Sequence, residues 1–314
     1  MTVKIVTDST SDLPPELIEE YGITIVPAYV QFNGKTYRDG IDITQDEIYQ
    51  KMVDDNIVVK TSQPPPSDFA SVYRSLLAET NEIISIQVTS KLSGIYNSAI
   101  QGREMVGGME RIEVIDSMST SMGLGLMTLA AARLAKAGED MTRIIEEIRA
   151  SIPRTHLWGI FDTLKYLFIG GRIGKAKALL GGMLNVKPML TMSDGELQPT
   201  GLVRTRAKGI DKLFENIKNC LNVQDIAIVH SSTPGDALSL KERIGAIVDK
   251  SSIHISRLGP ALGVHGGPGT LILALREKIS DIKQVPGNVE KVKRGITLPN
   301  LPSIHLPEIR LAAL

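Results

Sequence analysis

The chain has 314 residues, of which 42% are hydrophobic and 22% charged, and these proportions are typical of a globular protein with a sizeable buried core. The 35 acidic and 35 basic residues balance, so the sequence has no excess of positive charge for binding nucleic acid or for a polybasic attachment to a membrane. The one cysteine, Cys220, excludes disulfides within the chain and argues against metal sites built on thiolates.

The N-terminal segment turns polar after Val6, which is too early for a signal peptide. No run of about 18 apolar residues occurs, so the sequence predicts no transmembrane helix. We therefore expect a cytoplasmic protein whose contact with a membrane is transient at most.

Short β-branched segments alternate with helical segments in the first half of the chain. This rhythm is typical of a mostly parallel sheet with helices on both faces. Residues 83–88 form the clearest buried strand, because they are nearly all apolar and end in Thr89-Ser90. The predicted strands are 3–6, 23–30, 83–88 and 112–115, and the predicted helices begin near Pro14, Ser93 and Ser121.

A second group of strands and helices begins near residue 157. Asp194-Gly195 is typical of a tight hairpin turn between two of these strands, and Asp162 is expected to cap a helix. The predicted strands are 157–161, 187–192, 197–204, 226–230, 253–258 and 270–275, and the predicted helices are 172–184, 205–221 and 234–249.

These patterns predict an α/β fold with a boundary near residue 155. The N-terminal domain, 1–155, would hold the mostly parallel sheet, and the C-terminal domain, 156–280, would be an α/β domain with a mixed sheet. Residues 281–314 contain four prolines and are expected to form an extended tail.

Small hydroxyl and acidic side chains gather where predicted strands of the first half end. The carboxyl ends of parallel strands meet at one edge of a sheet, where helix N-termini favour a phosphate or a carboxylate. Ser, Thr and Asp are also the usual helix caps and turn residues, so these segments alone leave capping and ligand binding open. The segments are TDSTSD at 7–12, TSQPPPSDF at 61–69, TSKLSG at 89–94 and DSMST at 116–120.

Nucleotide, nucleophile and metal motifs are incomplete in this sequence. GGRIGKA at 170–176 is one residue shorter than a phosphate-binding loop and has Ala176 where Ser or Thr would hold magnesium. Ser93 is not part of G-x-S-x-G, and the five histidines lack metal-ligand spacing. In GVHGGPG at 263–269 we expect a sharply turning backbone that exposes His265, although an incidental histidine in a tight loop fits equally well.

Seven segments carry a resemblance to a known family. They are TDSTSDLP at 7–14, TSQPPPSDF at 61–69, SKLSGIYNSA at 90–99, DTLKYLFIGGRI at 162–173, KPML at 187–190, VRTRAK at 203–208 and GVHGGPG at 263–269. In this order they resemble the DegV family, which includes the fatty-acid-binding subunits of bacterial fatty acid kinase. The resemblance extends from the first strand to about Lys278.

The resemblance implies a two-domain α/β fold that binds a long-chain fatty acid between its domains, with the C-terminal domain closing over the ligand. It implies a protein that is not itself catalytic, that needs no metal or cofactor, and that presents the fatty acid to a separate kinase catalytic subunit, which makes the acyl phosphate. The carboxylate-binding residues that it implies are Thr61, Ser62, Ser93, Gly94, Arg204 and His265.

The sequence departs from the family pattern at two places. Ile95 stands where the family usually has a threonine, which removes a hydroxyl two residues after Ser93. Phe168-Ile169 replaces a pair that is commonly polar or basic, which puts docking of the kinase in doubt. Apolar residues on two predicted helices are candidates for the acyl-chain pocket, and core packing explains them as well: Leu164, Leu167, Phe168, Leu180, Met183 and Leu184.

Two other functions remain open from the sequence. One is a sensor or interaction module that uses bound lipid as a signal. The other is a hydrolase or phosphotransferase with Ser93 or His265 as the nucleophile, and for Ser93 this requires a base within hydrogen-bond reach.

Overall fold

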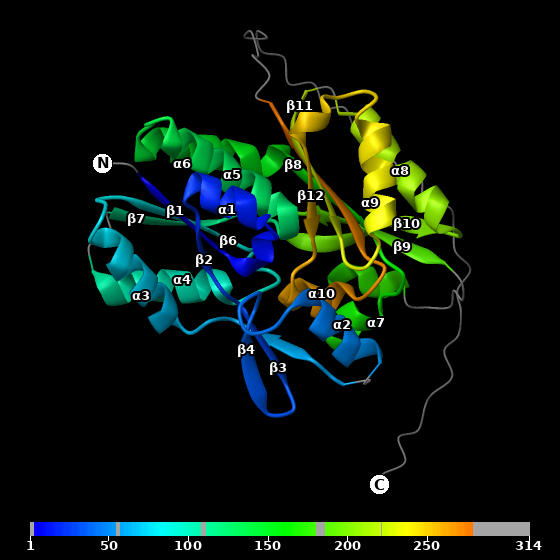
Figure 1. Ribbon diagram of the computed structural model, residues 1–314, viewed down its shortest axis with the longest axis horizontal. Helices are drawn as coiled ribbons and strands as arrows, with labels where there is room; N and C mark the ends of the chain where they lie inside the picture. Colours follow the sequence, from blue (N-terminus) through cyan, green and yellow to red (C-terminus); the bar gives the residue numbers. More distant parts are fainter. Residues whose placement is uncertain (1–2, 55–56, 108–110, 180–185, 221, 279–314) are drawn as a thin grey trace, which may run out of the picture. The chain divides into compact units, whose positions relative to one another are not determined.

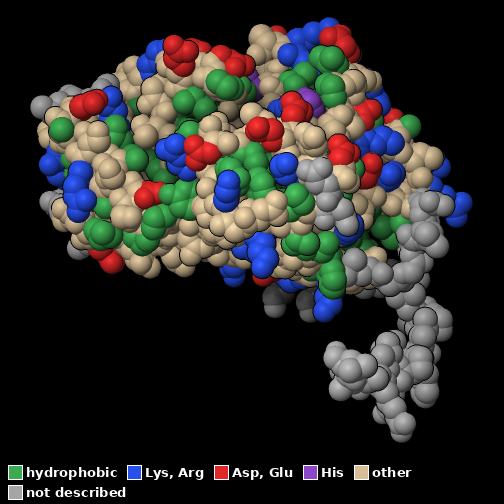
Figure 2. All heavy atoms as spheres, turned by 60° about the horizontal axis from the view of Figure 1, so that its bottom comes forward, with side chains coloured by type: hydrophobic (Ala, Val, Ile, Leu, Met, Phe, Trp, Pro, Cys, Tyr) green, Lys and Arg blue, Asp and Glu red, His purple; other side chains and the backbone are tan. Residues whose placement is uncertain are grey.

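The computed structural model describes residues 3–54, 57–107, 111–179, 186–220 and 222–278 (Figure 1). The predicted tail, 281–314, lies outside the described residues, as do Leu180, Met183 and Leu184. On the face drawn in Figure 2, acidic and basic side chains are interspersed, in keeping with a net charge of zero.

A four-stranded parallel sheet forms the N-terminal part of the fold, in the order β2-β1-β6-β7. All five residues of β6 are buried, because helices cover both faces of the sheet (Figure 1). The strands are β1 (Lys4–Asp8), β2 (Thr24–Val26), β6 (Ile83–Gln87) and β7 (Ile112–Asp116). The helices around this sheet are α1 (Pro15–Tyr21), α3 (Pro66–Leu77), α4 (Ile95–Val106), α5 (Ser121–Lys136) and α6 (Met141–Ser151).

A six-stranded mixed sheet forms the C-terminal part, in the order β10-β9-β8-β13-β11-β12. Only β11 and β12 pair in parallel. The strands are β8 (Thr155–Ile160), β9 (Lys187–Ser193), β10 (Glu196–Val203), β11 (Val223–His230), β12 (Ile253–Arg257) and β13 (Leu271–Glu277), and α8 (Arg206–Lys218) and α9 (Pro234–Ile244) pack against them. The predicted α/β class, with a parallel sheet followed by a mixed sheet, is confirmed.

Helix α5 lies between the parallel sheet and the mixed sheet and packs against both. Thirteen of its sixteen residues are buried, because it packs against β1 on one side and against β11 and β13 on the other. A buried ion network crosses the same junction: Arg276 of β13 donates to Asp225 (2.6 Å) and to Glu147 of α6 (3.0 Å). The main apolar core therefore runs through both sheets, and the predicted domain boundary near residue 155 stays a prediction.

The predicted strand 23–30 is in fact two strands in different sheets. Its first part is β2, and its second part begins β3 (Tyr29–Phe32), which pairs with β4 (Lys35–Arg38) and β5 (Lys60–Ser62) in a separate antiparallel sheet. The break falls at Pro27, which lacks the N–H that a continuing ladder needs. Helix α2 (Gln45–Val53) follows β4 and begins with a capping box between Thr44 and Glu47.

Three local predictions for the C-terminal part have different outcomes. The Asp194-Gly195 hairpin is confirmed, with φ of 50° and 75° at the two residues, as in the turn that hairpins favour. Asp162 does not cap α7 (Lys165–Ile169), because its carboxylate pairs with Lys187 (3.0 Å). The described part of the predicted helix 172–184 is a short 3₁₀ helix, Gly174–Leu179.

Candidate functional site

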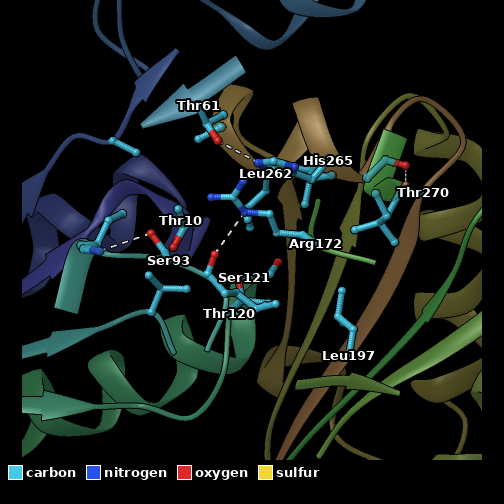
Figure 3. Close-up of a pocket in the computed structure, with 18 of the residues that line it drawn as sticks. Thr10, Thr61, Ser93, Thr120, Ser121, Arg172, Leu197, Leu262, His265 and Thr270 are labelled. Atoms are coloured by element: carbon cyan, nitrogen blue, oxygen red, sulfur yellow. Dashed lines mark hydrogen bonds between the residues drawn. The ribbon is translucent and has the colours of Figure 1, made fainter. Parts of the chain in front are cut away.

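A cavity lies between the parallel sheet, the small antiparallel sheet and the mixed sheet (Figure 3). The space between its lining atoms is about 870 Å³, part of it open to solvent. The apolar residues of its wall come from all parts of the fold: Val88, Ile95, Leu157, Phe161, Leu197, Leu258 and Ile272. Such a wall suits an apolar ligand.

Hydroxyl groups, a histidine and an arginine gather at one part of this cavity. Thr61 Oγ1 lies 2.8 Å from His265 Nε2, and Ser93 and Arg172 lie opposite them (Figure 3). Ser62 and Gln63 also line the cavity here. The structure thus brings together four of the six residues predicted to hold a carboxylate, and it adds Arg172.

Thr61 reaches the cavity from an unexpected element. It lies in β5, opposite Val30 of β3, and not in a loop at the edge of the parallel sheet as the sequence suggested. The other three polar segments do follow strands β1, β6 and β7, and they contribute Thr10, Ser93 and Thr120 to the cavity. Three of the four segments therefore lie at the carboxyl edge of the parallel sheet, as predicted, and the segment at 61–69 does not.

Ser93 and Gly94 form the start of α4. The Ser93 Oγ accepts a hydrogen bond from the Ile95 N–H (3.3 Å), so its own proton stays available for a ligand. Gly94 is the N-cap residue, and the Gln63 side chain lies 3.0 Å from where a Cβ on Gly94 would be. Gly94 therefore contributes close packing, while Ser93 combines a local backbone contact with a donor available to a ligand.

His265 lies in the last turn of helix α10 (Pro260–Gly266), which corrects the expected exposed loop. Two buried carboxylates hold the start of α10: Asp12 accepts from the Gly259 N–H (2.8 Å), and Asp39 accepts from the Ala261 N–H (3.3 Å). Burial raises the pKa of Asp12 to about 8 and that of Asp39 to about 6. The position of His265 thus depends on polar groups of the N-terminal part.

The imidazole of His265 is neutral near pH 7. Burial and, to a smaller extent, the positive charge of Arg172 lower its pKa to about 4. Nδ1 has no hydrogen-bond partner among the described residues, and the ring packs against Gly170 so closely that a Cβ there would overlap it. This favours the tautomer in which Nε2–H donates to Thr61 Oγ1, because the buried Nδ1 then carries no proton in need of an acceptor. The Thr61 hydroxyl can then donate into the cavity.

Arg172 supplies the positive charge of the site. Its Nε donates to the Leu92 carbonyl (3.2 Å) and its Nη1 to the Gly170 carbonyl (2.7 Å), which fixes the guanidinium at the cavity. The sequence motifs did not single out Arg172, although it belongs to the segment DTLKYLFIGGRI. Arg204, chosen in its place, is exposed and does not line the cavity.

Three of the six residues proposed for the acyl-chain pocket lie among the described residues. Leu167 lines the cavity and Leu164 does not, although both belong to one buried cluster with Phe161 and Leu190. Phe168 is 53% exposed and does not line the cavity, because it lies on the outer face of the short helix α7. Ile95 lines the cavity, so its side chain places an apolar group at the site.

Two features of the described residues concern metals and membranes. No group of three or more His, Cys, Asp or Glu side chains there could hold a metal ion. In the same ranges, none of the helices is both long enough and apolar enough to cross a bilayer.

Comparisons with known proteins agree over nearly the whole described chain. The model of the family of uncharacterised DegV proteins matches residues 2–278. A DegV domain-containing protein of Caldanaerobacter subterraneus subsp. tengcongensis is 36% identical over 279 residues, covering 88% of this chain and 99% of that protein. The solved fatty-acid-binding DegV family protein of Thermus thermophilus is 33% identical, with a TM-score of 0.82, and the match covers 88% of this chain and 100% of that one. A stearic-acid-binding protein of Eubacterium ventriosum is 30% identical, with a TM-score of 0.78 and coverage of 88% and 98%.

Proposed function

Because this chain belongs to the DegV family, as its sequence motifs predicted, we propose that it binds a long-chain fatty acid in the cavity between its sheets. The observation that carries the proposal is the division of the cavity into an apolar wall and a group of hydrogen-bond donors around Thr61, Ser93 and Arg172. A single-chain amphiphile with an acidic head matches that division.

The energetics favour such a ligand. Burial of an acyl chain contributes about 0.8 kcal/mol per methylene, so a chain of about 15 methylenes gains on the order of 10 kcal/mol. A buried carboxylate loses solvation unless hydrogen bonds and a positive charge replace it. The hydroxyl protons of Thr61 and Ser93 and the guanidinium of Arg172 would supply both.

We further propose that the protein presents the bound carboxylate to a separate kinase. In that reaction a carboxylate oxygen attacks the terminal phosphorus of ATP, and ADP leaves, which yields the acyl phosphate. Thr61, Ser93 and Arg172 are all only half-buried, so the proposed head-group site is within reach of another protein.

The catalytic alternative rests on the Thr61–His265 contact, which has the distance of a nucleophile–base pair. Two features oppose it. With a pKa near 4, His265 is a weak base at neutral pH, and no acid orients its Nδ1 among the described residues. The Ser93 hydroxyl has no hydrogen bond to a base among the described residues, where its partner is the Ile95 N–H.

Binding is tested by titrating the delipidated protein with stearate and with its methyl ester in a calorimeter. We expect the carboxylate to bind more tightly than the ester, because only the carboxylate uses the full charge of Arg172. Equal affinities, or no binding of either compound, would contradict the proposed site.

The three candidate functions are separated by a reconstitution. The protein, loaded with fatty acid, is incubated with ATP and a bacterial fatty acid kinase catalytic subunit, and acyl phosphate is measured. Product that depends on both proteins supports presentation. Binding without product favours the lipid sensor, and turnover of esters or acyl phosphates by this chain alone favours the hydrolase.

A further inference from the structure

The cavity contains a second polar region, away from Thr61 and His265, at the N-terminus of α5. Thr10, Thr120 and Ser121 line the cavity there (Figure 3). Thr120 is only 7% exposed, and its Oγ1 has no hydrogen-bond partner among the described residues. A buried hydroxyl without a partner is unfavourable next to a purely apolar ligand.

The neighbouring hydroxyl groups already donate to protein acceptors. Ser121 Oγ donates to Asp12 (2.6 Å), and Thr10 Oγ1 donates to Asp8 (2.5 Å). Thr270, on another part of the wall, donates to the Gly266 carbonyl (2.8 Å). Among these four cavity hydroxyls, Thr120 alone lacks a partner within the described chain.

Helix α5 adds donors at the same place. It has sixteen residues, begins at Ser121, and has no side-chain hydrogen bond from its N-cap residue, Thr120. The first N–H groups of such a helix lack partners within the helix and carry its positive dipole end. Thr120 and Ser121 both line the cavity, so the start of α5 lies at the ligand space.

The nearby charges decide which ligand group fits. The carboxyl groups of Asp8 and Asp12 lie directly behind Thr10 and Ser121, and burial raises the pKa of both. A second carboxylate on the ligand would be repelled by these acids whenever they ionise. A neutral hydroxyl can donate to Thr120 Oγ1 or accept from it, and it can also accept from a helix N–H.

We propose that the cavity selects fatty acids that carry a hydroxyl group on the acyl chain, and that Thr120 and the N-terminus of α5 bind this hydroxyl. The inference rests on the proposed function, since it concerns the chain of the same ligand. Thr120 is a specificity residue on this account, and the head group remains with Thr61, Ser93 and Arg172.

The test compares stearate with a series of monohydroxystearates in which the hydroxyl is stepped along the chain. Each displaces a fluorescent fatty acid from the delipidated full chain. We expect at least one regioisomer to bind about tenfold more tightly than stearate, because it satisfies a buried polar group that stearate leaves unpaired. The substitution Thr120→Val keeps the shape of the side chain and should abolish this preference, while Thr120→Ser should retain it.

Thr270→Val is the matched control, because the Thr270 hydroxyl lines the cavity but already has a protein acceptor. It should leave the ratio of affinities unchanged. Stearate binding as tightly as every regioisomer, or a preference that persists in Thr120→Val, would overturn the inference and leave fatty acid binding intact. Failure of stearate and of all its hydroxy derivatives to bind would instead overturn the proposed function.

Discussion

Thr61→Val removes a single hydroxyl from the proposed head-group site and leaves the shape of the side chain nearly unchanged. The lost interaction is a hydrogen bond to a charged group, which contributes about 1.5–3 kcal/mol. Fatty acid affinity should therefore fall roughly 10- to 100-fold. His265 Nε2 also loses its partner at 2.8 Å, so the melting temperature should fall as well.

The assay separates loss of the head-group contact from general damage. Stearate and methyl stearate are each titrated against the delipidated wild type and the variant. The methyl ester carries no charge, so Thr61→Val should weaken its binding much less than that of stearate. Thr36→Val, an exposed position on β4 of the same small sheet, is the control and should change neither affinity. Equal weakening of acid and ester, or a change of less than twofold for the acid, would refute a role of Thr61 in binding the carboxylate.

Three further predictions concern charge and exposure. Arg172→Met should weaken stearate binding and raise the pKa of His265 from about 4, measured by NMR titration of the ring, because the positive charge that lowers it is removed; an unchanged pKa would contradict this. In the folded state the pKa of Asp12 is about 8, so its carboxyl group stays protonated at low pH and adds to the free energy of unfolding there. This contribution is lost as the pH rises toward 8. Asp12→Asn should flatten this part of the stability profile in denaturant titrations, and a profile identical to the wild type would argue against a buried, protonated Asp12. Phe168→Ser should leave fatty acid affinity unchanged, because this side chain is 53% exposed. Weaker binding by the variant would show that Phe168 contributes to the acyl-chain pocket.

The arrangement of the parallel sheet follows from local patterns in the sequence. Residues 83–88 and 112–115 are short apolar runs with polar ends, and they form β6 and β7 nearly as predicted. The confirmed hairpin at Asp194-Gly195 needs only two residues with positive φ, which this dipeptide provides. Such features depend on neighbours in the chain, so one sequence is enough to predict them.

The errors concern contacts between distant segments. Thr61 was placed at the edge of the parallel sheet because the pairing of β5 with β3 is invisible to local pattern. His265 was expected in a glycine loop, but the carboxylates of Asp12 and Asp39 cap a short helix there from more than 200 residues away in the chain. The sequence does not show which of Arg172 and Arg204 reaches the ligand site. In the folded chain Arg172 lines the cavity, and Arg204 is exposed.

The sequence pattern partly predicted the polar region at Thr120. DSMST at 116–120 was recognised as a polar segment at a strand end, and the segment does reach the cavity. Whether its hydroxyls serve as caps or as donors depends on their partners. The Ser117 hydroxyl donates to the Ser119 carbonyl (3.2 Å), whereas the Thr120 hydroxyl has no partner in the described ranges, and this difference arises only in the folded chain.

Native mass spectrometry of the purified full chain tests the central claim most directly, because it weighs whatever occupies the cavity. The wild type should carry an added mass equal to that of a long-chain fatty acid, and the double variant Thr61→Ala, Ser93→Ala should carry none. A wild type without bound lipid, or a double variant that retains the same lipid, would contradict the assignment of Thr61 and Ser93 to the carboxylate.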